Sequence, residues 1–144
     1  MGLKTNDPRA YQPRAGLSNV GSYQVSGMPF ATGSIQAHGA GGASVSFDRV
    51  TSWVMVENDS AENLRVGFSS NGILGLNENW YYTMRPSSSL GPLDLKVTQL
   101  HLSGGAAAGN VSVMAGLTFI SSTAINNNTT SISGTNWSGS NGVG

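Results

Sequence analysis

Hydrophobic and polar residues alternate with a period of two through the centre of the chain. Val45 and Phe47 alternate with serines, and the stretch from Val50 to Val56 has apolar side chains on both of its faces. Residues 111–119 have the most regular alternation, and their opposite face is also half apolar. Alternation of this kind indicates β-strands, and apolar residues on both faces indicate a strand covered on both sides. We therefore expect residues 111–119 to form a central strand.

Turn-forming residues separate these strands. Residues 57–60, Glu-Asn-Asp-Ser, predict a turn because Asn and Asp side chains bond nearby backbone groups. Asn71-Gly72 predicts a tight reversal, and residues 85–89 predict a loop. A one-residue change of apolar phase between Val97 and Leu100 predicts a β-bulge.

The spacing of strands and turns predicts the fold class. No window of twelve residues shows a capped helical stripe. We count seven or eight short strands between residues 34 and 120, a pattern typical of an antiparallel sandwich or jelly roll. The sequence therefore predicts an all-β protein, an antiparallel β-sandwich or jelly roll of about seven or eight strands with extended N- and C-terminal arms.

The two ends of the chain differ from its centre. Residues 1–33 carry Pro8 and Pro13 and predict an extended N-terminal arm, although the part from residue 17 onward also allows short edge strands. Residues 34–120 predict the β-sandwich domain. Residues 121–144 predict a low-complexity polar C-terminal tail, because 19 of these 24 residues are Ser, Thr, Asn or Gly.

Apolar residues are sparse in the arms. A tail of this composition buries too little apolar area to offset an ordering entropy of about 1–2 kcal/mol per residue. We therefore expect neighbouring subunits to order the arms through a few apolar anchors. The expected anchors are Val20, Tyr23, Val25, Phe30, Ile125, Ile132 and Trp137.

Charge is scarce and unevenly placed. Seven basic and seven acidic residues make up 10% of the chain and leave a net charge of zero, against roughly 25% charged residues in an ordinary domain. Lys96 is the last charged side chain, so the final 48 residues carry none. Since monomers usually stay soluble through interspersed charge, this pattern favours a surface that meets other protein. The alternative is a tail that is polar and merely uncharged.

Composition also bears on the class of partner. Seven scattered basic residues give little of the basic patch that a nucleic-acid binder needs. No apolar run approaches the ~20 residues that span a bilayer, and residues 1–20 lack the apolar core of a signal peptide. We expect neither nucleic acid nor membrane as a partner.

Candidate catalytic and metal-binding residues are few. The absence of cysteine excludes disulfides, thiolate metal sites and a cysteine nucleophile. His38 and His101 lack the close spacing of a metal site like that of cupin-type jelly rolls. The carboxylates lie mostly in expected turns, and residues 57–62 are interpreted as a solvated turn rather than a calcium loop. We therefore expect no catalytic residue, no metal and no cofactor.

Three consecutive aromatic residues, Trp80, Tyr81 and Tyr82, provide a second hypothesis. They resemble the aromatic platform on which a carbohydrate-binding module stacks sugar rings. In the alternative, alternate members pack in the core and Tyr81 faces the next subunit, because aromatics are also enriched at interfaces. The second hypothesis is therefore a carbohydrate-binding module, or a tail or fibre component that binds host glycans.

An arm, GLSNVGSYQVSGMPFATG, leads into VTSWVMVENDSAENLRVGFSSNG, LKVTQLHLSG and VSVMAGLTFI, and a polar tail follows. This order of parts resembles the small jelly-roll virion proteins of tailed phages, the capsid decoration or cement proteins. The resemblance implies a non-enzymatic structural protein, commonly a homotrimer, that bridges major capsid or other virion proteins and has no catalytic residues. The long uncharged tail departs from that pattern and leaves a tail, fibre or baseplate location open. The lack of cysteine and of a signal peptide predicts assembly in the host cytoplasm.

Overall fold

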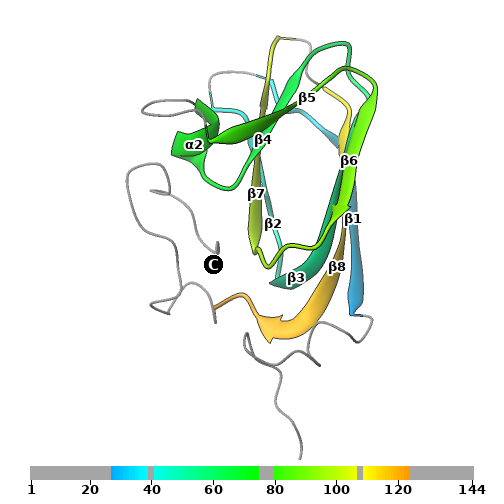
Figure 1. Cartoon of the computed structure of the whole chain (residues 1–144), viewed down its shortest axis with the longest axis vertical. Coiled ribbons are helices and arrows are strands. Elements are labelled where there is room, and N and C mark those ends of the chain that lie inside the picture. The colour runs from blue at the N-terminus through cyan, green and yellow to red at the C-terminus, as the bar shows by residue number, and fades with distance from the viewer. Residues whose placement is uncertain (1–26, 39–40, 75–79, 107–108, 124–144) are drawn as a thin grey trace, which may run out of the picture.

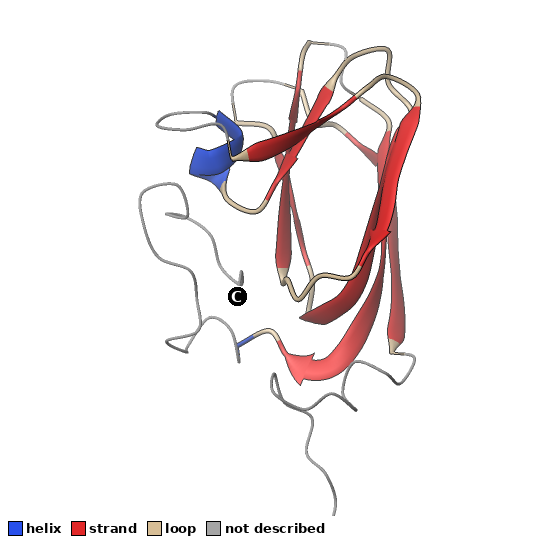
Figure 2. Cartoon of the chain, in the orientation of Figure 1, coloured by secondary structure: helices blue, strands red, loops and turns tan. Residues whose placement is uncertain are grey.

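The computed structural model describes residues 27–38, 41–74, 80–106 and 109–123. In these ranges the chain forms an all-β sandwich of two antiparallel four-stranded sheets (Figure 1), as the sequence predicts. Figure 2 shows a short helix beside the strands at one side of the sandwich. The elements are β1 (Met28–Ile35), β2 (Ala43–Ser46), β3 (Arg49–Asn58), β4 (Leu64–Gly67), α2 (Ser70–Leu74), β5 (Tyr81–Met84), β6 (Ser88–Leu93), β7 (Gln99–Gly104) and β8 (Val111–Ser121).

The strand order places β5 and β6 at open edges. One sheet has the order β1-β8-β3-β6 and the other β2-β7-β4-β5. β8 lies between β1 and β3, which confirms the expected central strand at residues 111–119. β5 and β6 follow one another along the chain and form edges of opposite sheets on the same side of the sandwich, the side that faces the viewer in Figure 1.

The core lies between the sheets and follows the period of two. On β3 and β8, alternate residues such as Val54, Val56 and Val113 are at most 2% exposed. Leu64 of β4 and Leu102 of β7 face them with no exposed surface. Each such side chain stabilises the fold by about 1.5–3 kcal/mol through the apolar area it removes from water. The alternation in the sequence therefore predicts correctly which residues of these strands face the core.

The first strand begins inside the segment that we assigned to the N-terminal arm. β1 starts at Met28 and pairs with β8, so the sandwich includes residues 28–33, and here the edge-strand alternative is the one observed. Phe30, expected as an arm anchor on a neighbour, packs edge-to-face on Phe47 with ring centroids 4.9 Å apart. Phe30 is partly buried and thus packs against the core of its own chain.

A short helix replaces the tight reversal expected at Asn71-Gly72. Ser69 explains the difference, because its hydroxyl accepts a hydrogen bond from the Gly72 N–H at 2.9 Å. The Ser69 carbonyl also accepts from the Ile73 N–H at 3.2 Å, so Ser69 caps the first turn of α2. Ile73 is fully buried against Gly67 of β4, where a Cβ would lie 2.5 Å from the Ile73 methyl carbon. The missing side chain lets α2 approach the sheet.

The expected loop at residues 85–89 is partly wrong, and the expected bulge after Val97 is wrong. Ser88 and Ser89 already belong to β6, which pairs with β3. The phase of apolar residues changes because the chain leaves one sheet after Leu93 and enters the other at Gln99. In between, the Val97 N–H and carbonyl bond to the side chain and N–H of Thr51, at 3.1 and 3.0 Å.

A buried amide joins the two connections at one end of the sandwich. The Asn58 side-chain nitrogen donates to the carbonyls of Glu62 at 2.8 Å and Arg85 at 3.0 Å. Its oxygen accepts from the N–H and the hydroxyl of Ser60, at 3.2 and 2.6 Å, which confirms the turn chemistry expected at residues 57–60. Asn58 has no exposed surface and uses its full hydrogen-bonding capacity. It ties the β3–β4 connection to the β5–β6 connection.

Replacing this amide should destabilise the whole domain. We expect Asn58→Ala to lower the free energy of unfolding by about 2–3 kcal/mol, because two carbonyls and the Ser60 groups lose their partner. The matched control is Asn63→Ala, at an exposed asparagine in the same connection, which should change stability by at most about 0.5 kcal/mol. Urea denaturation measures both values. An equal cost for the two variants would contradict the role of Asn58.

Candidate functional site: an apolar groove between two edge strands

The three consecutive aromatics do not form one platform. Tyr82 pairs with Val66 of β4, so its side chain is on the face of β5 that looks toward the other sheet. Tyr81 pairs with Gly67 and takes the opposite face, where the Arg65 guanidinium lies 4.5 Å from the centre of its ring. Trp80, just before β5, is 43% exposed and Tyr82 is 60% exposed. The structure therefore separates Tyr81 from the other two and does not pack Trp80 or Tyr82 in the core.

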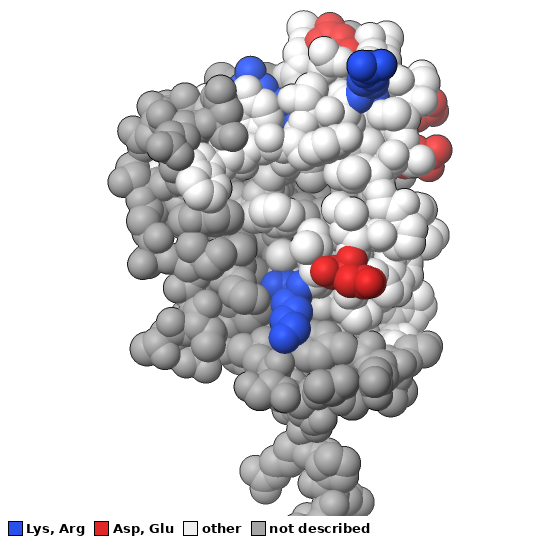
Figure 3. Space-filling model, in the orientation of Figure 1, with Lys and Arg blue, Asp and Glu red and all other residues white. Residues whose placement is uncertain are grey.

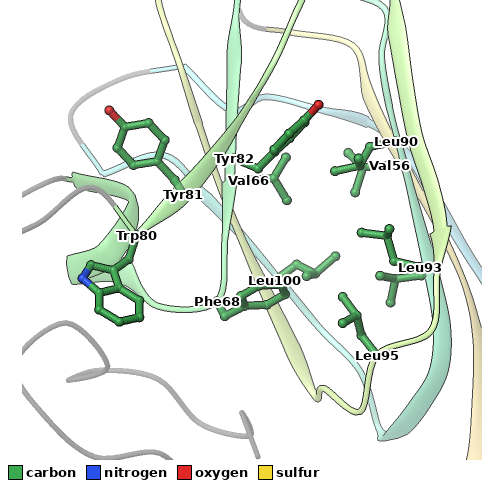
Figure 4. Close-up of a pocket in the computed structure, with 11 residues that line it drawn as sticks. Val56, Val66, Phe68, Trp80, Tyr81, Tyr82, Leu90, Leu93, Leu95 and Leu100 are labelled. Atoms are coloured by element: carbon green, nitrogen blue, oxygen red, sulfur yellow. The ribbon is translucent and has the colours of Figure 1, made fainter.

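Trp80 and Tyr82 instead line an apolar groove that enters the sandwich between β5 and β6. The groove has a volume of about 500 Å³, within the range of roughly 300–1,000 Å³ for ligand pockets. Figure 4 shows Tyr82 on one wall and Leu90, Leu93 and Leu95 on the other. The lining consists of Val54, Val56, Val66, Phe68, Trp80, Tyr81, Tyr82, Leu90, Leu93, Leu95 and Leu100. Tyr81 borders the groove although its ring points away from the leucines (Figure 4).

The floor and the rim of this groove differ in exposure. Val56 and Leu100 on the floor belong to the hydrophobic core and are buried. On the rim, Tyr82 and Leu93 are exposed by 60% and 36%. The groove is thus a part of the core that remains open to solvent along one side of the sandwich.

The surroundings of the groove carry little charge. Figure 3 shows this face of the molecule, with acidic and basic side chains mostly toward its upper end and margin and a basic and an acidic side chain next to each other lower down. The described surface between them is uncharged. Both rims are edge strands, so their outward backbone N–H and C=O groups have no partner strand in the described sheets. The site suits an apolar occupant that also offers hydrogen-bonding backbone.

A second, polar pocket lies on the other face of β5. Arg65 and Tyr81 border it together with Glu62, Thr83 and Ser103, and its volume is about 700 Å³. Arg65 is oriented by two contacts, the Tyr81 ring and a hydrogen bond of 3.2 Å to the Ile73 carbonyl. Carboxylate, guanidinium and hydroxyl groups here surround a single aromatic ring.

The candidate metal ligands do not form a metal cluster. His38 is exposed and makes an isolated bridge with Gly104, whereas His101 is only 6% exposed in β7. Within the described ranges, no three His, Cys, Asp or Glu side chains group together as metal ligands would. Asp59 forms a hydrogen bond of 3.4 Å with Asn110 rather than a carboxylate pair. Glu78 lies outside the described residues.

His101 is buried on the face of β7 that α2 covers. Its neighbour across the ladder is Gly67, on which Ile73 of α2 packs. The His101 Nε2 atom has no hydrogen-bond partner among the described residues. Burial disfavours the charged imidazolium and lowers the pKa of His101 below its usual 6.5.

Six of the seven expected arm anchors lie outside the described residues, namely Val20, Tyr23, Val25, Ile125, Ile132 and Trp137. The leucines of the groove were missed by the sequence analysis because Leu90 and Leu93 are three residues apart, not two. Pro92 offered a signal, since proline within a sheet is confined to edge strands and bulges.

No family model, no curated protein and no solved structure matches this chain. Among the elements described, no helix is long and apolar enough to cross a bilayer.

The burial of His101 predicts a pH dependence of stability. Because its pKa is lower in the folded chain, the unfolded chain binds more protons once the pH falls below about 6.5. Protonation therefore destabilises the fold as the pH falls from about 7 toward 5. We expect His101→Gln to weaken this dependence, by at most the one-proton limit of about 1.4 kcal/mol per pH unit. Urea denaturation across this pH range compares the two slopes, and identical slopes would contradict the prediction.

Proposed function

We propose that this chain is a non-enzymatic structural protein of a virion, a capsid decoration or cement protein that forms homo-oligomers and bridges neighbouring subunits. The observation that carries the proposal is the apolar groove between two unpaired edge strands, on a face with little charge. Exposed apolar side chains and open sheet edges are features by which protein chains associate. The uncharged final 48 residues agree with a surface that meets protein.

The strand pairing supports the finer assignment of the fold as a jelly roll. β1 pairs with β8, β2 with β7, β3 with β6 and β4 with β5, all antiparallel. A long antiparallel hairpin rolled into two sheets produces these four pairs, and jelly rolls have eight strands in two sheets. The resemblance to phage decoration proteins rests on the order of an arm, β-rich segments and a polar tail in the sequence, and this pairing is compatible with it.

The partners follow from the proposed role. We assign the chain to the virion, with a homotrimer as the favoured oligomer and major capsid or other virion proteins as the surfaces that it bridges. The proposal gives it no catalytic residue, no cofactor and no nucleic-acid contact. An oligomer that contacts a lattice at several points would bind it tightly even where each single contact is weak.

The oligomeric state and its dependence on the C-terminal tail test the proposal. We expect the full chain to sediment as a homo-oligomer, and a chain shortened after Thr123 to keep the sandwich, because β8 ends at Ser121. The shortened chain should bind virus particles, or other copies of itself, at least tenfold more weakly, since it lacks the expected anchors Ile125, Ile132 and Trp137. Analytical ultracentrifugation measures the first effect and particle co-sedimentation the second. A full chain that is monomeric and binds no particle would refute the proposed role.

Glycan binding is the second candidate, and the polar pocket around Tyr81 favours it. Arg65, Glu62 and Thr83 offer donors and acceptors for hydroxyl groups next to an aromatic ring. A protein on a virion surface can combine this role with the structural one.

A glycan array tests this second candidate. We expect Tyr81→Ala to weaken binding of any captured sugar by at least tenfold, because the ring and the orientation of Arg65 are lost together. The matched control is Tyr82→Ala, on the opposite face of the same strand, which should leave sugar binding unchanged. Binding to no sugar on the array, or equal loss in both variants, would discard the candidate.

A further inference from the structure

The groove between β5 and β6 lacks an occupant in the described chain. Its floor is continuous with the core, and its rim exposes Trp80, Tyr82 and Leu93 to solvent. Leaving this apolar area in water costs roughly 25 cal/mol for each Å² that could be buried. An occupant that fills the groove with apolar side chains would therefore stabilise the molecule.

We infer that the groove receives residues 22–26 of a second copy of this chain. The segment reads Ser-Tyr-Gln-Val-Ser, so in an extended conformation Tyr23 and Val25 share one face and the three polar residues share the other. This is the pattern of a peptide that adds to a sheet edge, where alternate side chains enter pockets. The segment carries no charge, and neither do the side chains that line the groove.

The length of the chain excludes the groove of the same copy. Residue 26 directly precedes Gly27 and β1, and β1 and β6 are the opposite edges of one sheet. Three inter-strand spacings of about 4.8 Å separate these edges by roughly 14 Å. Val25 is two residues from Gly27 and reaches at most about 7 Å in a fully extended chain. Val25 therefore cannot enter the groove of its own copy, so a segment that inserts both Tyr23 and Val25 has to enter the groove of another copy.

The side chains that line the groove can accommodate Tyr23 and Val25. Trp80 and Tyr82 stand at the rim, where an incoming tyrosine ring can pack against aromatic faces and keep its hydroxyl in water. Leu90, Leu93 and Leu95 form an aliphatic wall for a valine. β5 offers outward backbone groups along the same rim.

This inference rests on the proposed function, because it supplies the contact by which copies associate. The natural chain has no cysteine, so introduced cysteines report contacts without background. We would co-express two full-length chains with different tags, one carrying Tyr23→Cys and the other Leu93→Cys. After mild oxidation we expect a disulfide-linked pair of the two chains as the main product. The control pair combines Tyr23→Cys with Ser44→Cys, an exposed position on β2 at the far edge, and should cross-link at most one tenth as much.

A second pair of variants tests the energetics without cysteines. Tyr23→Ser with Val25→Ser should raise the dissociation constant of the oligomer at least tenfold. Ser22→Ala with Gln24→Ala, on the polar face of the same segment, should leave it within about twofold. Sedimentation equilibrium of the full-length proteins measures both.

The outcomes separate the inference from the proposed function. If the chain is oligomeric but the Tyr23–Leu93 pair cross-links no better than the control, the inference is wrong and the proposed function stands. A chain carrying both cysteines that closes its disulfide within one copy would also overturn it. So would a tightly bound apolar small molecule, found in the groove by native mass spectrometry. A full chain that stays monomeric and binds no particle would refute both.

Discussion

The Asn58 amide joins the two connections that link the sheets at one end of the sandwich. It bonds the carbonyl of Glu62, in the connection from β3 to β4, and that of Arg85, in the connection from β5 to β6. Each connection carries the chain from one sheet to the other. Because the amide is fully buried and fully bonded, neither connection can shift without leaving polar groups unpaired. Asn58 thereby fixes the end of the sandwich at which β5 and β6 are joined, and with it the closed end of the groove.

The groove exists because β5 and β6 are joined at that end and diverge from it. Below their connection each strand pairs on one side only, β5 with β4 and β6 with β3. Gly91 adopts a φ of +107° where the β6 register shifts, and a Cβ there would lie 2.8 Å from the Val54 carbonyl oxygen. Position 91 therefore favours glycine. The shift of register at this position places both Leu90 and Leu93 on the groove wall. A core that opens to solvent between two edge strands destabilises a monomer. In an assembly, the same opening provides a contact surface.

Sequence reasoning identified those strands whose neighbours bury one face completely. β3 and β8 follow the period of two because Val54 and Val113 meet the opposite sheet. It missed the start of β6, since only pairing with β3 makes a strand of Ser88 and Ser89. It also missed α2, because the cap at Ser69 is a hydrogen bond to a residue three positions on, not a hydrophobic pattern. The groove could not be predicted, because it depends on which strands end up at the edges.

The two edges also limit what can dock on them. β5 has only four residues, and β6 contains Pro92, which has no N–H to donate, next to a shifted register. Short strands, prolines and bulges are devices by which proteins prevent indiscriminate pairing of sheet edges. A long ladder of backbone bonds therefore cannot form here with an arbitrary strand. Selectivity has to come from side chains that fit between Tyr82 and the leucines, which favours a short apolar segment on a sister chain over general aggregation.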